Sequence, residues 1–141
     1  MRDIRFRGKD ANTWVYGDLT HHTIIGEDYV GISNKSDTDR NGCATRHMVK
    51  PETVGQFTGV NDPNGKEVWE SDIIGYIDSE TNITSVFGVV RWSEEGCFYI
   101  NDNSSNGYSG GSPGANVGYM IPHHKSLIVI GNVYDNPELL K

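Results

Sequence analysis

Apolar and polar positions alternate with a period of two through much of the chain, which is the pattern of short, half-buried β-strands. Near the start, Ile4 and Phe6 alternate with charged residues, and a turn-rich stretch separates them from the apolar run 14–19. Residues 24–25 and 29–32 are two further short strand candidates. We therefore expect N-terminal antiparallel hairpins, with Ile4 and Phe6 on the buried side of the first strand.

The second half of the chain carries the stronger strand signals. Residues 86–92 are rich in β-branched and aromatic side chains, and Ser93-Glu94-Glu95-Gly96 after them predicts a tight turn onto a strand over 97–100. Further strands are predicted over residues 72–77 and 127–134. Short strands joined in this order resemble the core of an SH3-like small barrel, an analogy of topology that does not by itself set a function.

Two long polar segments interrupt the strand pattern. Residues 33–45 lack periodic apolar positions, and residues 101–118 are dominated by Asn, Ser and Gly, so we expect both to be loops and the second to be a flexible excursion. Pro51 allows at most one helical turn, and Asn136 followed by Pro137 predicts an N-cap and a short C-terminal helical turn.

The fold class expected from these segments is mostly β. Small antiparallel sheets, long flexible loops and a short C-terminal helical turn make up a single 1–141 domain. A division is also considered, into an N-terminal β part over 1–50 and a barrel-like part over 51–141. A chain of 141 residues with 35% hydrophobic residues and 17 glycines is in the range of one turn-rich globular domain.

Charge and cysteine content narrow the function classes. A net charge of −7 argues against diffuse attraction to nucleic acid or anionic membranes, because that attraction relies on clustered Lys and Arg. Cys43 and Cys97 have no metal-ligand spacing, and Cys97 is expected to be buried in a strand. The charged N-terminus lacks an apolar core, so we expect a cytoplasmic protein with no membrane association.

Residues 55–74 carry the most specific pattern of the chain: Gly-Gln-Phe-Thr-Gly-Val-Asn-Asp-Pro-Asn-Gly-Lys-Glu-Val-Trp-Glu-Ser-Asp-Ile-Ile. Pro63 suits the second position of a tight turn and Gly65 supplies positive φ where the chain leaves it, so the flanking strands are expected to pair. Asp72 stands at the entry to a strand, where a carboxylate most often accepts backbone hydrogen bonds.

Together with residues 1–9, 14–19 and 129–140, this motif resembles the YopX family of bacteriophage and prophage proteins. Ser71 stands where the family motif usually has Gly, which predicts that the backbone there does not require positive φ. The resemblance implies a mostly β, cytoplasmic accessory protein whose relatives self-associate, and it carries no established reaction. The motif residues, expected to be structural, are Gly55, Gln56, Phe57, Thr58, Gly59, Asp62, Gly65, Lys66, Glu70 and Asp72.

Candidate catalytic groups are weak. The histidine pairs 21–22 and 123–124 are more typical of surface polar residues than of metal ligands, since neighbouring strand residues face opposite ways. Residues 107–111 do not form the strained turn of a nucleophilic serine. Glu70 and Asp72, two apart on one strand, would share a face as an acid and base pair does, but a structural role is favoured. We expect no catalytic residue, cofactor or metal, and hence no enzyme.

Two hypotheses of function remain, with a third more distant. The first is a non-enzymatic, oligomeric protein-binding module that acts on an unknown host or phage protein. The second is a small-barrel nucleic-acid-binding protein that uses a basic ridge of Arg2, Arg5 and Arg7, although the solvated face of a strand is the more ordinary reading of that ridge. Trp92, Phe98 and Tyr99 would supply its aromatic surface. The third is a metal-assisted hydrolase built on the histidine pairs.

Overall fold

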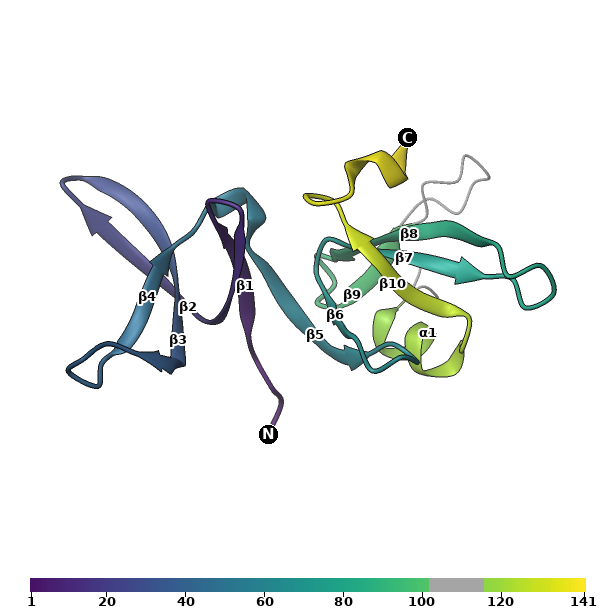
Figure 1. Cartoon of the computed structure of the whole chain (residues 1–141), viewed down its shortest axis with the longest axis horizontal. Helices are drawn as coiled ribbons and strands as arrows, with labels where there is room; N and C mark the ends of the chain where they lie inside the picture. Colours follow the sequence, from purple (N-terminus) through teal and green to yellow (C-terminus); the bar gives the residue numbers. More distant parts are fainter. Residues whose placement is uncertain (102–115) are drawn as a thin grey trace. The chain divides into compact units, whose positions relative to one another are not determined.

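The computed structural model describes residues 1–101 and 116–141 and is mostly β, as the sequence predicts (Figure 1). In chain order the elements are β1 (Phe6–Asp10), β2 (Thr13–Ile24), β3 (Glu27–Thr38), β4 (Ala44–Met48), η1 (Pro51–Thr53), β5 (Gly55–Asn61), β6 (Glu67–Trp69), β7 (Asp72–Ile77), β8 (Thr84–Trp92), β9 (Phe98–Asn101), α1 (Val117–His123), β10 (Leu127–Asn132) and η3 (Pro137–Leu140).

The chain divides into two compact units, an N-terminal unit of residues 1–57 and a C-terminal unit of residues 58–141. Strand β5 begins in the first unit and ends in the second. In the N-terminal unit the strands lie in the order β4-β3-β2-β1, with the start of β5 next to β1. The C-terminal unit holds the antiparallel sheet β10-β7-β8-β9, together with β6 and the end of β5 next to it. This strand set is consistent with an SH3-like barrel, which stays a prediction.

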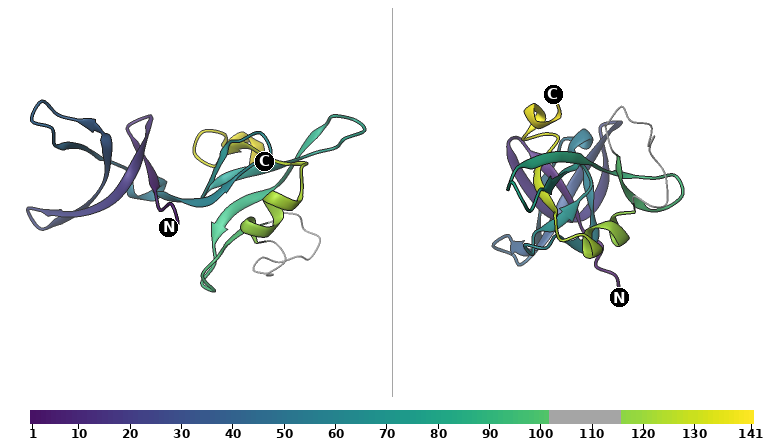
Figure 2. Two further views of the ribbon diagram at one scale, coloured as in Figure 1. Left: turned by 90° about the horizontal axis from the view of Figure 1, so that it is seen from below. Right: turned by 90° about the vertical axis from the view of Figure 1, so that its right-hand side faces the viewer.

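Strands β2 and β3 form a long, curved hairpin (Figure 2). Ile24 pairs with Glu27, so the connection consists of Ile25 and Gly26 alone, with φ of 53° and 79°. Two central residues with positive φ are typical of the type I′ turn, whose twist suits a two-residue hairpin. Of these two residues, Gly26 takes that conformation freely, whereas the β-branched Ile25 does not.

The prediction of a long loop over residues 33–45 is wrong. Strand β3 continues to Thr38 and β4 begins at Ala44, with Asn34 paired to Thr45 and an irregular register between Asn34 and Thr38. Residues 35–38 are exposed, so this stretch of β3 buries no side chain. An apolar period of two marks only strands with a buried face, which is why the polar pattern indicated a loop.

The first strand fits its expectation only in part, because Phe6 is half-buried but Arg7 on the opposite face is buried as well. Ile4 precedes β1 and is 49% exposed, whereas Arg7 is 5% exposed. At Gly8, on the same face as Phe6, an added Cβ would sit 2.8 Å from a methyl carbon of Val49. The close approach of Val49 leaves room only for glycine at this position. Arg7 points to the opposite face of the strand, where its guanidinium covers the Trp14 ring.

The C-terminal unit contains a continuous apolar core. Strand β7 is buried on both faces, since neighbouring Ile73 and Ile74 are both fully buried. Helix α1 contacts β9 and β10 and adds Val117 and Ile121, four residues apart on one helix face. The buried cluster consists of Val68, Ile74, Val90, Ile100, Val117, Ile121, Leu127 and Val129.

Helix α1 corrects one end of the predicted excursion over 101–118. Asn101 ends β9, and Asn116 caps α1 by accepting a hydrogen bond from the Tyr119 amide at 3.3 Å. Val117 is 1% exposed, so this part of the tract does contribute to the core. Residues 102–115 lie outside the described residues, and the expectation for them stands as a prediction.

Both short helical turns expected from proline positions are present. Pro51 begins η1, and Pro137 begins η3 with Asn136 at the N-cap position. The Asn136 side chain accepts a hydrogen bond from the Asn132 amide at 3.3 Å and does not cap η3. Over residues 1–101 and 116–141, no helix is long and apolar enough to cross a membrane.

Candidate functional site

The turn of the β5–β6 hairpin is organised around the carboxylate of Asp62. One oxygen, Oδ1, accepts hydrogen bonds from the Asn64 and Lys66 amides, both at 2.9 Å. The other oxygen, Oδ2, accepts from the Val129 amide of β10 at 3.0 Å. Gly65 has φ of 82°, as predicted for the residue that leaves the turn. Asp62 therefore closes a tight turn and also covers a backbone donor at the outer edge of β10.

Asp72 fixes the next connection, between β6 and β7. It is 2% exposed, and its Oδ2 accepts a hydrogen bond from the Trp69 amide at 2.8 Å, as expected for a carboxylate at a strand entry. Glu70 lies in the turn before β7, so Glu70 and Asp72 do not share a strand face, and the expectation that they would is wrong. The geometry of this connection is that of a structural turn.

The prediction about Ser71 is also wrong, because its φ is 70°. The Ser71 amide donates to the Val90 carbonyl at 2.9 Å, and the Ser71 carbonyl accepts from the Val133 amide at 3.0 Å. These two bonds, to segments far away in the sequence, hold the backbone in the left-handed region. A serine there adopts a conformation that glycine reaches at lower cost, in agreement with the glycine usual in the family motif.

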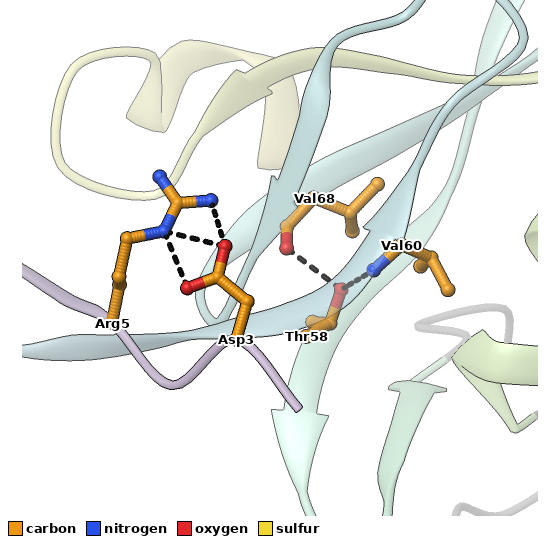
Figure 3. Close-up of polar contacts among 5 residues, drawn as sticks. All are labelled: Asp3, Arg5, Thr58, Val60 and Val68. Atoms are coloured by element: carbon orange, nitrogen blue, oxygen red, sulfur yellow. Dashed lines mark hydrogen bonds and ion pairs between the residues drawn. The ribbon is translucent and has the colours of Figure 1, made fainter. Parts of the chain in front are cut away.

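The remaining motif residues lie on β5 and β6. Thr58 donates its hydroxyl to the Val68 carbonyl at 2.7 Å and accepts from the Val60 amide at 3.4 Å (Figure 3). Gly59 has φ of 88°, and Phe57 is buried. Gly55 and Gln56 pair with Arg7 and Phe6 of β1. The backbone amide of Lys66 donates to Asp62, and the residue is exposed at the turn.

The basic side chains near the N-terminus stack on aromatic rings. The Arg5 guanidinium lies 4.6 Å from the centre of the Phe57 ring, and that of Arg7 lies 4.6 Å from the centre of the Trp14 ring. Lys9 adds its ammonium group at 5.3 Å from the same Trp14 ring. Arg5, Arg7 and Lys9 alternate along the chain and so face one side of the sheet. Each contact is a cation–π interaction.

This arrangement changes the predicted basic ridge. Arg7 is buried, and Arg5 is paired with Asp3, whose carboxylate oxygens lie 2.9 and 3.0 Å from the Arg5 Nε (Figure 3). Arg2 is exposed and precedes β1. The aromatic residues expected to cooperate with the ridge are in the C-terminal unit, where Trp92 packs edge to face on Phe98 at 4.8 Å and Tyr99 lies in β9.

The two histidine pairs lie in different types of secondary structure. His21 and His22 are neighbours in β2, and the His22 Nε2 lies 2.9 Å from the Thr20 hydroxyl. His123 ends α1 and His124 follows it. The described residues contain no cluster of three or more His, Cys, Asp or Glu side chains that could hold a metal ion. Cys97 lies in the turn before β9 and is partly exposed, which corrects its expected place in a strand.

One polar cluster was missed by the sequence reasoning. The His47 ring lies between two carboxylates, with Nδ1 3.3 Å from Asp10 and Nε2 3.5 Å from Asp37. The three residues come from β1, β3 and β4, and only strand pairing brings them together. Nothing in their spacing along the chain could have predicted the cluster.

The tip of the β2–β3 hairpin exposes a group of apolar side chains in the N-terminal unit. Ile24 is 50% exposed, Ile25 98% and Tyr29 37%. The Tyr29 hydroxyl donates to Glu27 at 2.8 Å, and the Glu27 carboxylate raises the pKa of Tyr29 above its ordinary value. Thr23 donates to Asp28 at 2.7 Å. Two adjacent isoleucines before a glycine are the sequence signal for this tip, although the pattern by itself predicts only short strands.

Comparison with known proteins gives a family and a fold. The model of the family described as "YopX protein" matches residues 5–141. Among solved structures, the crystal structure of protein EF1440 from Enterococcus faecalis is similar at a TM-score of 0.55 and 18% sequence identity, covering 100% of each chain. At that identity the likeness concerns the fold alone. No curated protein matches the chain significantly.

Proposed function

The chain belongs to the YopX family, and from that premise we propose that it is a non-enzymatic, oligomeric protein-binding module. In this proposal it is encoded by a phage or prophage and acts in the cytoplasm of the bacterial host. The observation that carries the proposal is the exposed apolar tip of the β2–β3 hairpin, formed by Ile24, Ile25 and Tyr29.

The burial of the N-terminal unit supports self-association. Within residues 1–57, the buried apolar side chains are Ile32, Val49 and Phe57. A unit of this size normally needs a larger apolar core than three side chains provide. Among the strands that the structure describes, β4 also ends the order in this unit and has a pairing strand on one side alone. Contact with a second copy of the chain would add buried area and cover such an edge in one step.

The backbone at the hairpin tip supports a contact role for Ile25. A β-branched residue at φ of 53° is strained, and Asn or Gly would fit this turn better. With a side chain 98% exposed, Ile25 gains no packing within its own chain to offset that strain. Strain of this kind is more often retained where a residue serves binding than where it serves the fold.

The nucleic-acid and hydrolase hypotheses have less support. Arg7 is buried over Trp14, Arg5 is paired with Asp3, and the net charge is −7, all of which weaken attraction to phosphates. In the part of the chain that the structure describes, the histidine pairs join no larger metal-ligand cluster.

Light scattering on a size-exclusion column at micromolar concentration tests the oligomer. We expect a mass that is a multiple of 15.6 kDa. The double variant Ile24→Lys, Tyr29→Lys should reduce that mass, because charged side chains at the tip oppose apolar contact. The matched control is Ile83→Lys, Val86→Lys, which changes two apolar residues of the C-terminal unit that are 65% and 41% exposed. A monomeric unmodified protein would overturn the proposal.

Pull-down from host lysate, with and without nuclease, tests the partner class. We expect a captured protein that survives nuclease treatment and is lost with the Ile24→Lys, Tyr29→Lys variant. Capture that disappears with nuclease would instead support nucleic-acid binding.

A further inference from the structure

A surface cavity of about 340 Å³ opens in the C-terminal unit, and its lining includes none of the hairpin-tip residues Ile24, Ile25 and Tyr29. Its volume is at the lower end of the range of small-molecule sites, about 300–1,000 Å³. The floor is apolar and the rim is basic. The described residues that line it are Tyr76, Phe87, Met120, His123, His124, Lys125, Ser126 and Leu127.

The apolar floor depends on an irregularity of the sheet. Ile74 pairs with Gly88 but the next residue, Gly75, pairs with Val86, so Phe87 is an extra residue in β8. Such a bulge redirects a side chain, and here Phe87 lines the cavity while packing against the apolar core. Met120 is likewise partly buried against the core, and Leu127 is buried. These three apolar side chains together offer a surface that can contact an apolar body.

One rim residue has a fixed ring. The His123 Nδ1 lies 2.7 Å from the Tyr119 carbonyl, and because a carbonyl only accepts, Nδ1 carries the proton. The His123 ring also stacks on the Tyr119 ring, with 4.5 Å between ring centres. These two contacts orient the ring. The Nε2 atom takes no part in the hydrogen bond to the Tyr119 carbonyl.

The charge of the rim is the reverse of the charge of the whole chain. His123, His124 and Lys125 follow one another, and residues 116–127 include no Asp or Glu. Toward the other residues that the structure describes, the Lys125 ammonium group makes no hydrogen bond or ion pair. A positive group next to an apolar floor complements an anion with an apolar body.

We propose that this cavity binds a small organic carboxylate whose body is aromatic or aliphatic and about the size of two fused rings. The body lies on Phe87, Met120 and Leu127, and the carboxylate pairs with Lys125, with the imidazole group of His124 at the rim as a further donor. A neutral or cationic molecule of the same shape lacks the charge pairing and binds more weakly.

Nuclear magnetic resonance titration of the ¹⁵N-labelled full chain with 2-naphthoate tests this site. We expect saturable shifts at the amides of Phe87 and residues 120–127, with the neutral 2-naphthamide binding about tenfold more weakly. Lys125→Glu should weaken 2-naphthoate by about tenfold, whereas the matched control Lys141→Glu should change it less than about twofold. Met120→Trp, which fills the cavity, should abolish the shifts while the spectrum remains that of a folded protein.

The titration, the comparison of acid and amide, and each variant have a result that would contradict the proposal. The absence of saturable shifts at about 5 mM 2-naphthoate would overturn the proposal. Equal binding of the acid and the amide, or an equal effect of Lys125→Glu and Lys141→Glu, would overturn the role of charge. Shifts that persist in Met120→Trp would place the ligand elsewhere. None of these results depends on the oligomeric state, so they are independent of the proposed function.

Discussion

In the C-terminal unit a cluster of apolar side chains from β6–β10 and α1 is buried, whereas in the N-terminal unit Ile32, Val49 and Phe57 are the buried apolar residues. The C-terminal unit is also tied together by the carboxylates of Asp62 and Asp72, both buried and both bonded to backbone amides. The N-terminal unit relies on strand pairing and on cations stacked over aromatic rings.

The difference indicates a division of labour between the units. A sheet with little buried apolar area gains less free energy from its own packing, about 25 cal/mol for each Å² buried. Its exposed apolar side chains remain available to another molecule. The C-terminal unit buries its own strands and can present a cavity without losing its fold. The four predictions that follow test this contrast, from the largest expected effect to the smallest.

Two fully buried isoleucines compare the units directly. Ile74→Ala is expected to lower the free energy of unfolding by about 3–5 kcal/mol, because the cavity it leaves is enclosed by the packed cluster. Ile32→Ala should cost about 2–3 kcal/mol, since the open sheet around it can relax. Urea denaturation followed by tryptophan fluorescence gives both values. Equal losses would mean that the N-terminal unit is as tightly packed as its partner unit.

The next prediction concerns the buried carboxylate of Asp62. Asp62→Ala leaves three backbone amides without their acceptor, among them that of Val129, and should cost about 2–4 kcal/mol. Asp78→Ala is the matched control, because Asp78 also accepts from two amides, those of Glu80 and Thr81, at an exposed turn.

Water can replace the exposed carboxylate of Asp78, so its loss should be clearly smaller than that of Asp62. The amides of Thr81 and then of Glu80 lower the pKa of Asp78 below its ordinary value. The stability that Asp78 contributes is thus present above its ordinary pKa and is lost as the pH falls through its lowered pKa. Thermal melts at neutral and acidic pH measure this. A larger loss for Asp78→Ala at neutral pH would contradict the assignment.

The hairpin tip of the N-terminal unit offers a stabilising change. Ile25→Asn places Asn before Gly26, the pair favoured in a type I′ turn, and should raise stability by about 1 kcal/mol. The same variant should weaken self-association, because it removes the most exposed apolar side chain of the tip. Thermal melts at low concentration and light scattering separate the two effects. Lower stability would show that Ile25 packs in its own unit.

Ser71→Gly is the corresponding change in the C-terminal unit. It relieves a left-handed serine at φ of 70° and should raise the free energy of unfolding by up to about 0.5 kcal/mol, since glycine also adds disorder to the unfolded chain. Self-association should not change, in contrast to Ile25→Asn. Urea denaturation is sensitive enough if both proteins are compared in one series. A loss of stability would mean that the Ser71 side chain is needed where it is buried.

Local features were predicted from the sequence because neighbouring residues alone determine them. The strands β7, β8 and β10 followed from apolar, β-branched runs, and the turns at Gly65 and Gly96 followed from residues that tolerate positive φ. The turn onto η3 followed from Pro137. Each of these signals lies within a few residues of the feature that it predicts.

What only the tertiary structure decided depends on residues far apart in the chain. Val49 covers β1 on the face of Gly8 and Trp14 lies against Arg7 on the other face, so both faces of this strand are covered. Val90 and Val133 hold Ser71 in the left-handed region. The Asp62 carboxylate reaches an amide 67 residues away. Alternation along a strand gives two faces but does not say which one is covered, because coverage is a property of the neighbouring segments.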